Sequence, residues 1–214
     1  MRRFFSSVLF FLSGAAIGIW GWSMWRQSAV QKQDEAAFNR EVAAPASPRT
    51  PPVAPAPAKF TAREARRGAG VVARLSIPRI QLRAMVREGD DDDTLDVALG
   101  HIPGTALPGQ KGNVGVAGHR DRLFRRLAEL ARDDRIELQT PVATYTYKVD
   151  QMAIVSPQAV SVLAPGHGSE LTLVTCYPFN YIGSAPKRYI VTAHLISQGA
   201  GDGAVPALPS GTHE

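Results

Sequence analysis

The sequence of 214 residues contains a single cysteine, Cys176, so it can form neither an internal disulfide nor a cysteine-rich zinc site. By base rate, a lone cysteine in a folded domain is a small buried apolar residue. If the domain lies outside the cytosol, however, an unpaired thiol needs an explanation, because that environment is oxidising. The surroundings of Cys176 therefore decide whether its role is structural or chemical.

Residues 70–198, where the strand-like patterns lie, also lack the excess of positive charge that a nucleic-acid-binding surface needs. The formal net charge is +5, but residues 1–69 carry 10 Lys/Arg and 4 Asp/Glu, whereas residues 70–198 carry 14 and 13. The tail at 199–214 carries 0 and 2. Because the basicity lies in the N-terminal arm, we expect no nucleic-acid partner.

One stretch lacks charge altogether: residues 4–25 form a long, mostly apolar run. As a helix, its 22 residues would cover about 33 Å, enough for a bilayer core of about 30 Å. A cleaved signal peptide is the alternative, but the run is longer than a usual signal core and ends in tryptophans, not a small-residue cleavage site. We predict a retained signal anchor, with Arg2 and Arg3 keeping the N-terminus inside and the rest of the chain outside.

Residues 26–69 are predicted to be a polar and proline-rich linker. The part at 26–42 is polar and could extend the helix for a few turns. The stretch 43–58, AAPASPRTPPVAPAPA, is typical of a semi-rigid polyproline-like stalk. We place the folded domain at 70–198, and we expect the Gly/Pro-rich tail at 199–214 to be disordered.

Short strands separated by turns dominate the folded domain. Only two short helical segments are expected, at 94–99 and 123–130. Four aspartates at 90–93 are interpreted as an N-cap and acidic first turn, because the spaced ligands and closing Glu of an EF-hand are missing. About seven short strands with little helix predict an all-β barrel or sandwich. The strand patterns cover residues 71–77, 80–86, 113–118, 135–139, 144–155, 171–176 and 188–197.

Cys176 ends one of these strand patterns, LTLVTC at 171–176. Pro178 has no backbone N–H, so the strand is predicted to stop just after Cys176. The end of a strand is a rigid place from which to present a thiol. A thiol becomes a useful nucleophile when it is ionised or when a base takes its proton.

His119 is the base favoured by position, because it ends a buried strand pattern just as Cys176 does. Two such ends at one rim could place imidazole beside thiol. His101 and His167 lie in Gly/Pro-rich loops and stay open as alternatives. Two further histidines are less suited, one in the middle of a strand (His194) and one in the tail (His213).

Arg188 is favoured by the length of the preceding loop. An antiparallel return after Cys176 would place Arg188 at the start of its strand, beside the end of the previous one. A guanidinium there is always charged and rich in donors, so it could stabilise an oxyanion during acyl transfer. Without Cys176 as a neighbour, a solvated strand-end arginine would be the better interpretation.

Three segments together resemble the active-site signatures of sortases: GNVGVAGHRD at 112–121, TLVTC at 172–176 and APKRYIV at 185–191. The order of His, Cys and Arg also matches that family. The stretches PGTALPGQKGNVGVAGHRD and TCYPFNYIGSAPKRYIV are most similar to class D sortases. The resemblance covers about residues 71–197, which is the whole predicted domain.

The resemblance implies an all-β fold: a closed barrel of about seven to eight strands with short helices, preceded in the sequence by one transmembrane helix. It also implies a cysteine transpeptidase in which Cys176 attacks the Thr carbonyl of a C-terminal LPxTG-like sorting signal and forms a thioacyl enzyme. His119 would be the general acid/base and Arg188 the substrate or oxyanion stabiliser, with Thr175 a weaker candidate for the oxyanion region. The implied bond chemistry uses no metal or cofactor, although some family members respond to calcium.

The implied partners are sorting-signal proteins, an amine of a peptidoglycan precursor or of another protein, and the cytoplasmic membrane. The expected location is a single-pass membrane protein with its catalytic domain outside the cytoplasm. Two alternatives stay open from the sequence. One is a cysteine peptidase that uses water as the acceptor, and the other is an anchored β-domain without catalytic activity.

Overall fold

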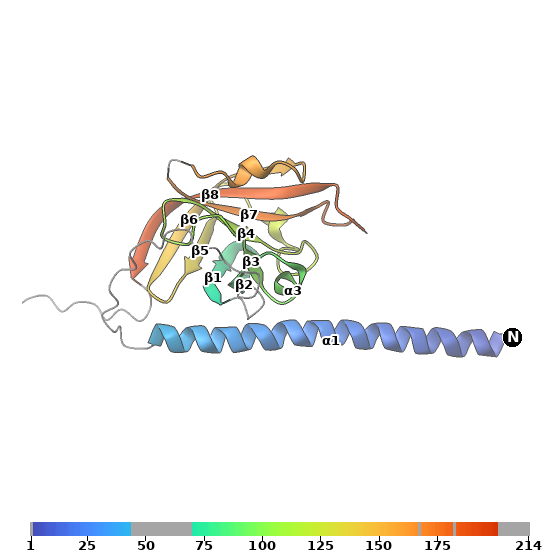
Figure 1. Ribbon diagram of the computed structural model, residues 1–214. Coiled ribbons are helices and arrows are strands. Elements are labelled where there is room, and N and C mark those ends of the chain that lie inside the picture. Colours follow the sequence, from blue (N-terminus) through green and yellow to red (C-terminus); the bar gives the residue numbers. More distant parts are fainter. Residues whose placement is uncertain (1, 44–69, 167, 182, 201–214) are drawn as a thin grey trace, which may run out of the picture.

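The computed structural model describes residues 2–43, 70–166, 168–181 and 183–200 (Figure 1). In these ranges the chain forms one long helix, α1 (Arg2–Ala43), and a closed barrel with strand order β1-β2-β3-β4-β7-β8-β6-β5. The strands are β1 (Val71–Ile77), β2 (Leu82–Glu88), β3 (Leu99–His101), β4 (Gly112–Ala117), β5 (Arg135–Gln139), β6 (Ala143–Val155), β7 (Ser169–Tyr177) and β8 (Lys187–Ala200). The short elements are α3 (Asp92–Leu95) and the 3-10 turns η1 (Pro78–Ile80), η2 (Leu127–Glu129) and η3 (Val160–Leu163).

The predicted all-β class and closed barrel are confirmed, with one strand more than the seven that the sequence pattern indicated. The additional strand is β3, which has only three residues and lies where a helix end and a loop were predicted. It forms because β2 and β4 flank it: Glu88 pairs with His101 in parallel, and Gly100 pairs with Ala117 in antiparallel register. Such a short strand depends on its neighbours and leaves no periodic signal in the sequence.

Local chemistry explains the short elements. Asp91 caps α3, since its carboxylate accepts bonds from the Thr94 N–H and hydroxyl, both at 3.0 Å. The first of these bonds is the main reason why the pKa of Asp91 is lowered. The interpretation of the acidic run as a helix cap is therefore confirmed, although α3 is shorter than predicted. The predicted second strand also begins later, at Leu82, because Pro78 opens a 3-10 turn that ends at Gln81 with φ of 52°.

The inward faces of the strands fill the barrel. In β7, Leu171, Leu173 and Thr175 are at most 2% exposed, so this face of the predicted alternation packs inward. Burying a side chain such as Leu contributes about 1.5–3 kcal/mol, and this fixes the register of β7. The largest fully buried side chains are Tyr147, Phe124, Leu75, Ile77, Met85, Leu99, Leu127, Ile136, Leu138, Leu171, Leu173 and Val86.

The register of three strands brings the candidate segments to one edge of the barrel. β4 and β7 are parallel, with Ala117 opposite Val174, so both strands end on the same side. β8 returns antiparallel to β7 and places Arg188 opposite Cys176. We call this edge, formed by the C-terminal ends of β4 and β7 and the start of β8, the rim.

The helix α1 runs without a break to Ala43, and the barrel lies along its C-terminal half (Figure 1). The expected extension of the helix over 26–42 is present, and this segment also contacts β1 and β2 through Asp34 and Phe38. This segment is held by the Asp34–Arg87 ion pair and by the ring of Phe38 beneath Arg74, so only part of its docked face is apolar. In the described residues, no helix combines the length and apolarity needed to cross a membrane. Most of the proline-rich stretch and the residues after Ala200 lie outside the described ranges.

Candidate active site

Cys176 and Arg188 are direct register partners at the rim. The predicted stop after Cys176 is confirmed, because β7 ends at Tyr177. Arg188 donates from Nη1 to the carbonyls of Ala185 (3.3 Å) and Lys187 (3.1 Å). In the part of the chain that the structure describes, Nε and Nη2 bind no other residue, so this edge of the guanidinium can serve a ligand.

His119 lies two residues beyond the end of β4, at the same rim. The ladder continues past β4, because the Gly118 N–H donates to the Val174 carbonyl at 3.1 Å. From the other side, the buried Thr175 hydroxyl donates to the Gly118 carbonyl at 2.7 Å. Gly118 is thus fixed to β7 through both its backbone groups, directly before His119 and directly across from the end of β7 that carries Cys176.

Gly118 has no room for a larger residue. An added Cβ would lie 2.7 Å from side-chain atoms of both Leu99 and Phe124. The close packing therefore requires glycine at this position, which keeps the backbone before His119 tight against the core. This contact explains in physical terms why a glycine precedes the histidine.

The imidazole of His119 faces an acidic side chain that no sequence pattern indicated. Nε2 of His119 lies 3.6 Å from Oδ1 of Asp96, in the segment between α3 and β3. Arg122 lies on the same carboxylate at 3.2 Å and also donates to the Asp96 carbonyl at 2.8 Å. No spacing rule connects Asp96 with His119, because the contact depends on the long loop between β3 and β4.

Arg120 fixes the loop between β7 and β8. Its Nη2 donates to the carbonyls of Tyr181 (2.7 Å) and Gly183 (2.9 Å), and its guanidinium lies 5.7 Å from the Tyr181 ring centroid. These contacts tie the residue after His119 to the loop that leads from Cys176 to Arg188. No sequence pattern indicates this role either, since it depends on the conformation of the loop.

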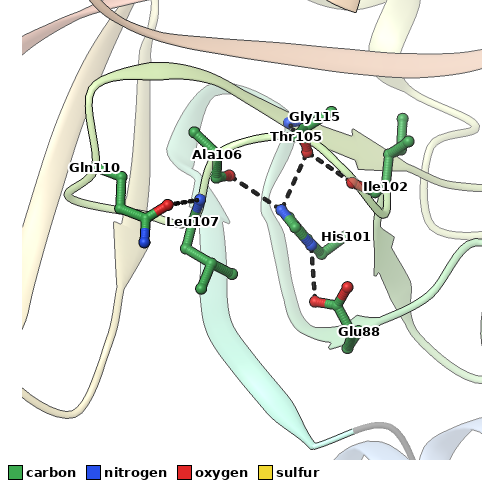
Figure 2. A network of polar contacts seen from close by, with 8 residues as sticks. All are labelled: Glu88, His101, Ile102, Thr105, Ala106, Leu107, Gln110 and Gly115. Atoms are coloured by element: carbon green, nitrogen blue, oxygen red, sulfur yellow. Dashed lines mark hydrogen bonds and ion pairs between the residues drawn. The ribbon is translucent and has the colours of Figure 1, made fainter. Parts of the chain in front are cut away.

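His101, one of the alternative bases, is buried in a network away from solvent (Figure 2). Nδ1 lies 2.8 Å from the Glu88 carboxylate, and Nε2 lies 3.0 Å from the Ala106 carbonyl and 3.1 Å from the Thr105 hydroxyl. The hydroxyl donates to the Ile102 carbonyl at 2.7 Å, so towards His101 it acts as an acceptor. Both ring nitrogens therefore face acceptors, and the network favours a doubly protonated ring that pins the loop between β3 and β4.

The electrostatics of His101 agree with this geometry. Burial alone would lower the pKa of His101, but the hydrogen bonds to Glu88 and to the Ala106 carbonyl, with the charges of Glu88 and Asp90, outweigh it and raise the pKa. A ring that is charged, buried and bonded at both nitrogens is poorly suited to exchange protons with Cys176. Its role is structural.

This network predicts a pH-dependent effect of Glu88→Gln on stability. Because folding raises the pKa of His101, its stabilising contribution is complete below about pH 6.5, its unfolded value, and is lost as the pH rises through the folded pKa. The substitution should cost about 1–3 kcal/mol at pH 6 and much less at pH 9, where Gln can donate to a neutral ring. Thermal melting at both pH values measures this, and equal losses would contradict it.

The matched control is Asp150→Asn, which removes a similar pair at the surface. His194 lies in β8, with Nδ1 2.6 Å from Asp150, and both side chains are more than 40% exposed. Because exposed pairs contribute little, the control should change stability by less than about 1 kcal/mol. His194 is in mid-strand as predicted. His167 and His213 lie outside the described residues.

A pocket of about 250 Å³ opens on the face of the β7–β8 ladder that carries Cys176 and Arg188. Thr172 and Thr192 line the pocket and are register partners. On each strand they lie four residues from the Cys176–Arg188 pair, and therefore on the same face of the ladder. Four residues of strand cover about 13 Å, so an extended peptide could reach from the rim to the pocket. The other lining residues are Asn113, Gln151, Ala153, Ser161, Val162, Ala164, Glu170 and Ile190.

Comparison with known proteins agrees with this arrangement of strands and side chains. The family model described as the sortase domain matches residues 75–196, more than half of the chain, so the chain belongs to the sortase family, whose members are cysteine transpeptidases. It is 39% identical to Sortase D of Bacillus subtilis (strain 168) over 118 residues, which are 55% of this chain and 60% of that protein. It is 29% identical to Sortase A of Bacillus anthracis over 130 residues, 59% of this chain and 60% of that protein. The chain thus spans about three fifths of the curated relatives it matches.

Solved structures give the same result. A Clostridium perfringens Sortase D5 transpeptidase superposes with a TM-score of 0.62 at 26% identity, over 79% of this chain and 99% of that one. Sortase E1 from Streptomyces coelicolor, solved with a tripeptide in its active site, gives 0.57 at 29% identity, over 64% and 94%. The predicted similarity to sortases, class D included, is confirmed.

Proposed function

We propose that this protein is a transpeptidase that cleaves an LPxTG-like sorting signal after Thr and transfers the cleaved protein to an amine of the cell envelope. The observation that carries the proposal is the register of the rim. Cys176 is opposite Arg188, and His119 follows the end of the neighbouring parallel strand by two residues. A nucleophile, an acid/base and a fixed cation thus occupy three adjacent strand ends, as acyl transfer requires.

The first half of the reaction breaks the peptide bond after Thr. His119 takes the thiol proton of Cys176 as the sulfur attacks the Thr carbonyl, and a C–S bond forms while the oxygen becomes an oxyanion. The free edge of Arg188 stabilises this charge. When the tetrahedral intermediate collapses, the C–N bond breaks, and His119 gives its proton to the departing amine. A thioacyl enzyme and a free C-terminal fragment remain.

The second half reverses these roles with a new amine. The acceptor amine attacks the thioester carbonyl, and His119 takes the proton that the amine loses. The C–S bond then breaks, and the leaving Cys176 sulfur takes the proton back from His119, so that a new amide bond has formed and the enzyme is regenerated. If water attacks instead, the same residues produce a carboxylic acid, and the protein is a peptidase.

The test of the proposal is incubation of the full chain with a library of sorting-signal peptides, with and without an added amine such as triglycine. Mass spectrometry of the products distinguishes the two acceptors. We expect cleavage after Thr and conversion of the fragment to its amide with the added amine. A free acid as the sole product would make the protein a peptidase, and no cleavage of any peptide would contradict the proposed substrate class.

We also propose that residues 4–25 anchor the protein in the cytoplasmic membrane, with the barrel on the outer side. The support is the charge-free run and the two arginines before it. In addition, α3 lies at the end of the barrel nearer the N-terminus of α1 (Figure 1), and the next residue, Asp96, faces His119. With an anchor at 4–25, the rim would therefore lie on the membrane side of the barrel, close to substrates that are themselves bound to the membrane.

This topology predicts the result of limited proteolysis. Protease added to cells that lack an outer barrier should cut within 44–69, between α1 and the barrel, and leave the N-terminal fragment in the membrane. Immunoblotting of membrane and soluble fractions measures this. A mature chain already lacking residues 1–25 would indicate a cleaved signal peptide, and protection of 44–69 in intact cells would reverse the orientation.

A further inference from the structure

The C-terminal half of α1 is held to the barrel by a shielded ion pair and a buried aromatic ring. The Asp34 carboxylate accepts two bonds from the Arg87 guanidinium, each at 2.7 Å, and Asp34 is only 8% exposed. One turn further, Phe38 is 2% exposed and lies under the guanidinium of Arg74, 4.7 Å from the ring centroid. A bidentate pair that is shielded from water is among the stronger polar contacts in proteins, so this contact fixes the helix on β1 and β2.

Gln31, one turn before Asp34, makes a different kind of contact. Its side-chain oxygen accepts from the Met85 N–H, and its nitrogen donates to the Val97 carbonyl, both at 2.8 Å. β2 and β3 are paired from Val86 and Leu99 onwards, so Met85 and Val97 lie just before the point where the strands meet. The amide of Gln31 therefore bridges two backbone groups at a gap in the sheet.

The residue before Val97 is Asp96, the acidic side chain that faces His119. The backbone is held at this position and at the next, because Arg122 donates to the Asp96 carbonyl at 2.8 Å and Gln31 donates to the Val97 carbonyl at 2.8 Å. A continuous set of contacts thus leads from α1 through Gln31 and Val97 to Asp96 and the imidazole. Asp96 is 40% exposed, so its place is set by these backbone contacts more than by burial.

We propose that Asp96 is a positioning residue for His119, and that the docked α1 keeps Asp96 in place through Gln31. The inference rests on the proposed function, in which His119 is the acid/base. A carboxylate beside the ring favours one ring orientation and stabilises the imidazolium that forms when His119 takes a proton. The helix is then part of the active-site scaffold, and its release from the barrel lowers turnover without changing Cys176 or Arg188.

The first test compares Asp96→Asn with Asp96→Glu in the full chain, with peptide and amine as substrates. Asp96→Asn removes the charge but keeps the shape, and we expect kcat to fall about 10-fold while KM stays within about twofold. Asp96→Glu keeps the charge and should recover most of the rate. A purely structural role would affect both variants alike and would lower the melting temperature, so equal kcat values for the two variants would overturn the proposal.

The second test concerns the helix. Gln31→Glu can still accept from Met85 but can no longer donate to Val97, and we expect kcat to fall about threefold or more with KM unchanged. The matched control is Gln33→Glu, which makes the same change of charge on an exposed position of α1. In a double variant with Asp96→Asn, the two effects should not multiply, because both act through Asp96. Equal kcat for Gln31→Glu and Gln33→Glu would overturn the role of the helix.

The same assay separates this inference from the proposed function. His119→Ala should reduce turnover to near background. If His119→Ala stays active, the assignment of the acid/base is wrong. If His119→Ala is inactive while Asp96→Asn and Gln31→Glu keep full kcat, only the positioning by Asp96 and α1 is wrong.

Discussion

Replacing Cys176 with Ala is expected to abolish both cleavage of the sorting-signal peptide and formation of the thioacyl adduct, while the fold stays intact. The side chain lies at the rim and is only partly buried, and β7 is held by backbone bonds and by its inward leucines. Little packing is therefore lost with the sulfur, and the melting temperature should change by only about 2 °C. Peptide turnover, intact mass and thermal melting together measure the result.

Cys176→Ser is the matched control for this prediction. The hydroxyl has nearly the size of the thiol but is a far weaker nucleophile at its free pKa, so this variant should also be inactive. Turnover above background in the Ala variant would assign the nucleophile to another residue. Loss of the folded state in both variants would instead give Cys176 a structural role.

The second large effect is expected for Arg188→Lys, which keeps the charge but loses the planar fork of donors. If the free edge of Arg188 stabilises charge on the Thr carbonyl, kcat should fall by roughly 10²–10³-fold, the size found for one oxyanion donor. If it only orients bound substrate, KM should rise while kcat is unchanged. Steady-state kinetics separate the two, and a variant with both constants unchanged would contradict any role for Arg188.

His119→Ala provides the comparison, because it removes a proton carrier and leaves the oxyanion site complete. Its residual rate should lack one limb of the pH profile that the Arg188→Lys enzyme retains. An unaltered pH profile would return the acid/base role to another group. Since His101 is enclosed by Glu88, Ala106 and Thr105, His167 would be the next residue to test.

The pairing of Cys176 with Arg188 could be predicted because it depends on local sequence. Alternation fixes which side of β7 faces the core, Pro178 ends the strand, and the loop returns the chain antiparallel. The place of His119 was harder to predict, since it depends on β4 and β7 lying side by side in parallel. Its position after a strand pattern and the family resemblance both indicated His119, but the pairing of β4 with β7 joins segments that are far apart in the sequence.

The contacts that sequence patterns did not indicate are those between distant segments. Gln31 and Asp34 are polar residues on an exposed-looking helix, and their partners Met85 and Arg87 follow more than 50 residues later. Asp96 lies inside the short helix predicted at 94–99, and nothing in its spacing connects it with His119. Such contacts become visible only when the barrel has brought β2, β3 and β4 together.

Cys176 is expected to carry the cleaved substrate as a thioester, and intact-mass spectrometry of the full chain detects this intermediate. After brief incubation with a cleavable sorting-signal peptide and no added amine, we predict an adduct with the mass of the fragment that ends in Thr. Digestion should locate it on Cys176, and an added amine should remove it with release of the new amide. If the peptide is cleaved with no adduct on Cys176 at any time, and if Cys176→Ala cleaves it equally fast, Cys176 is not the nucleophile.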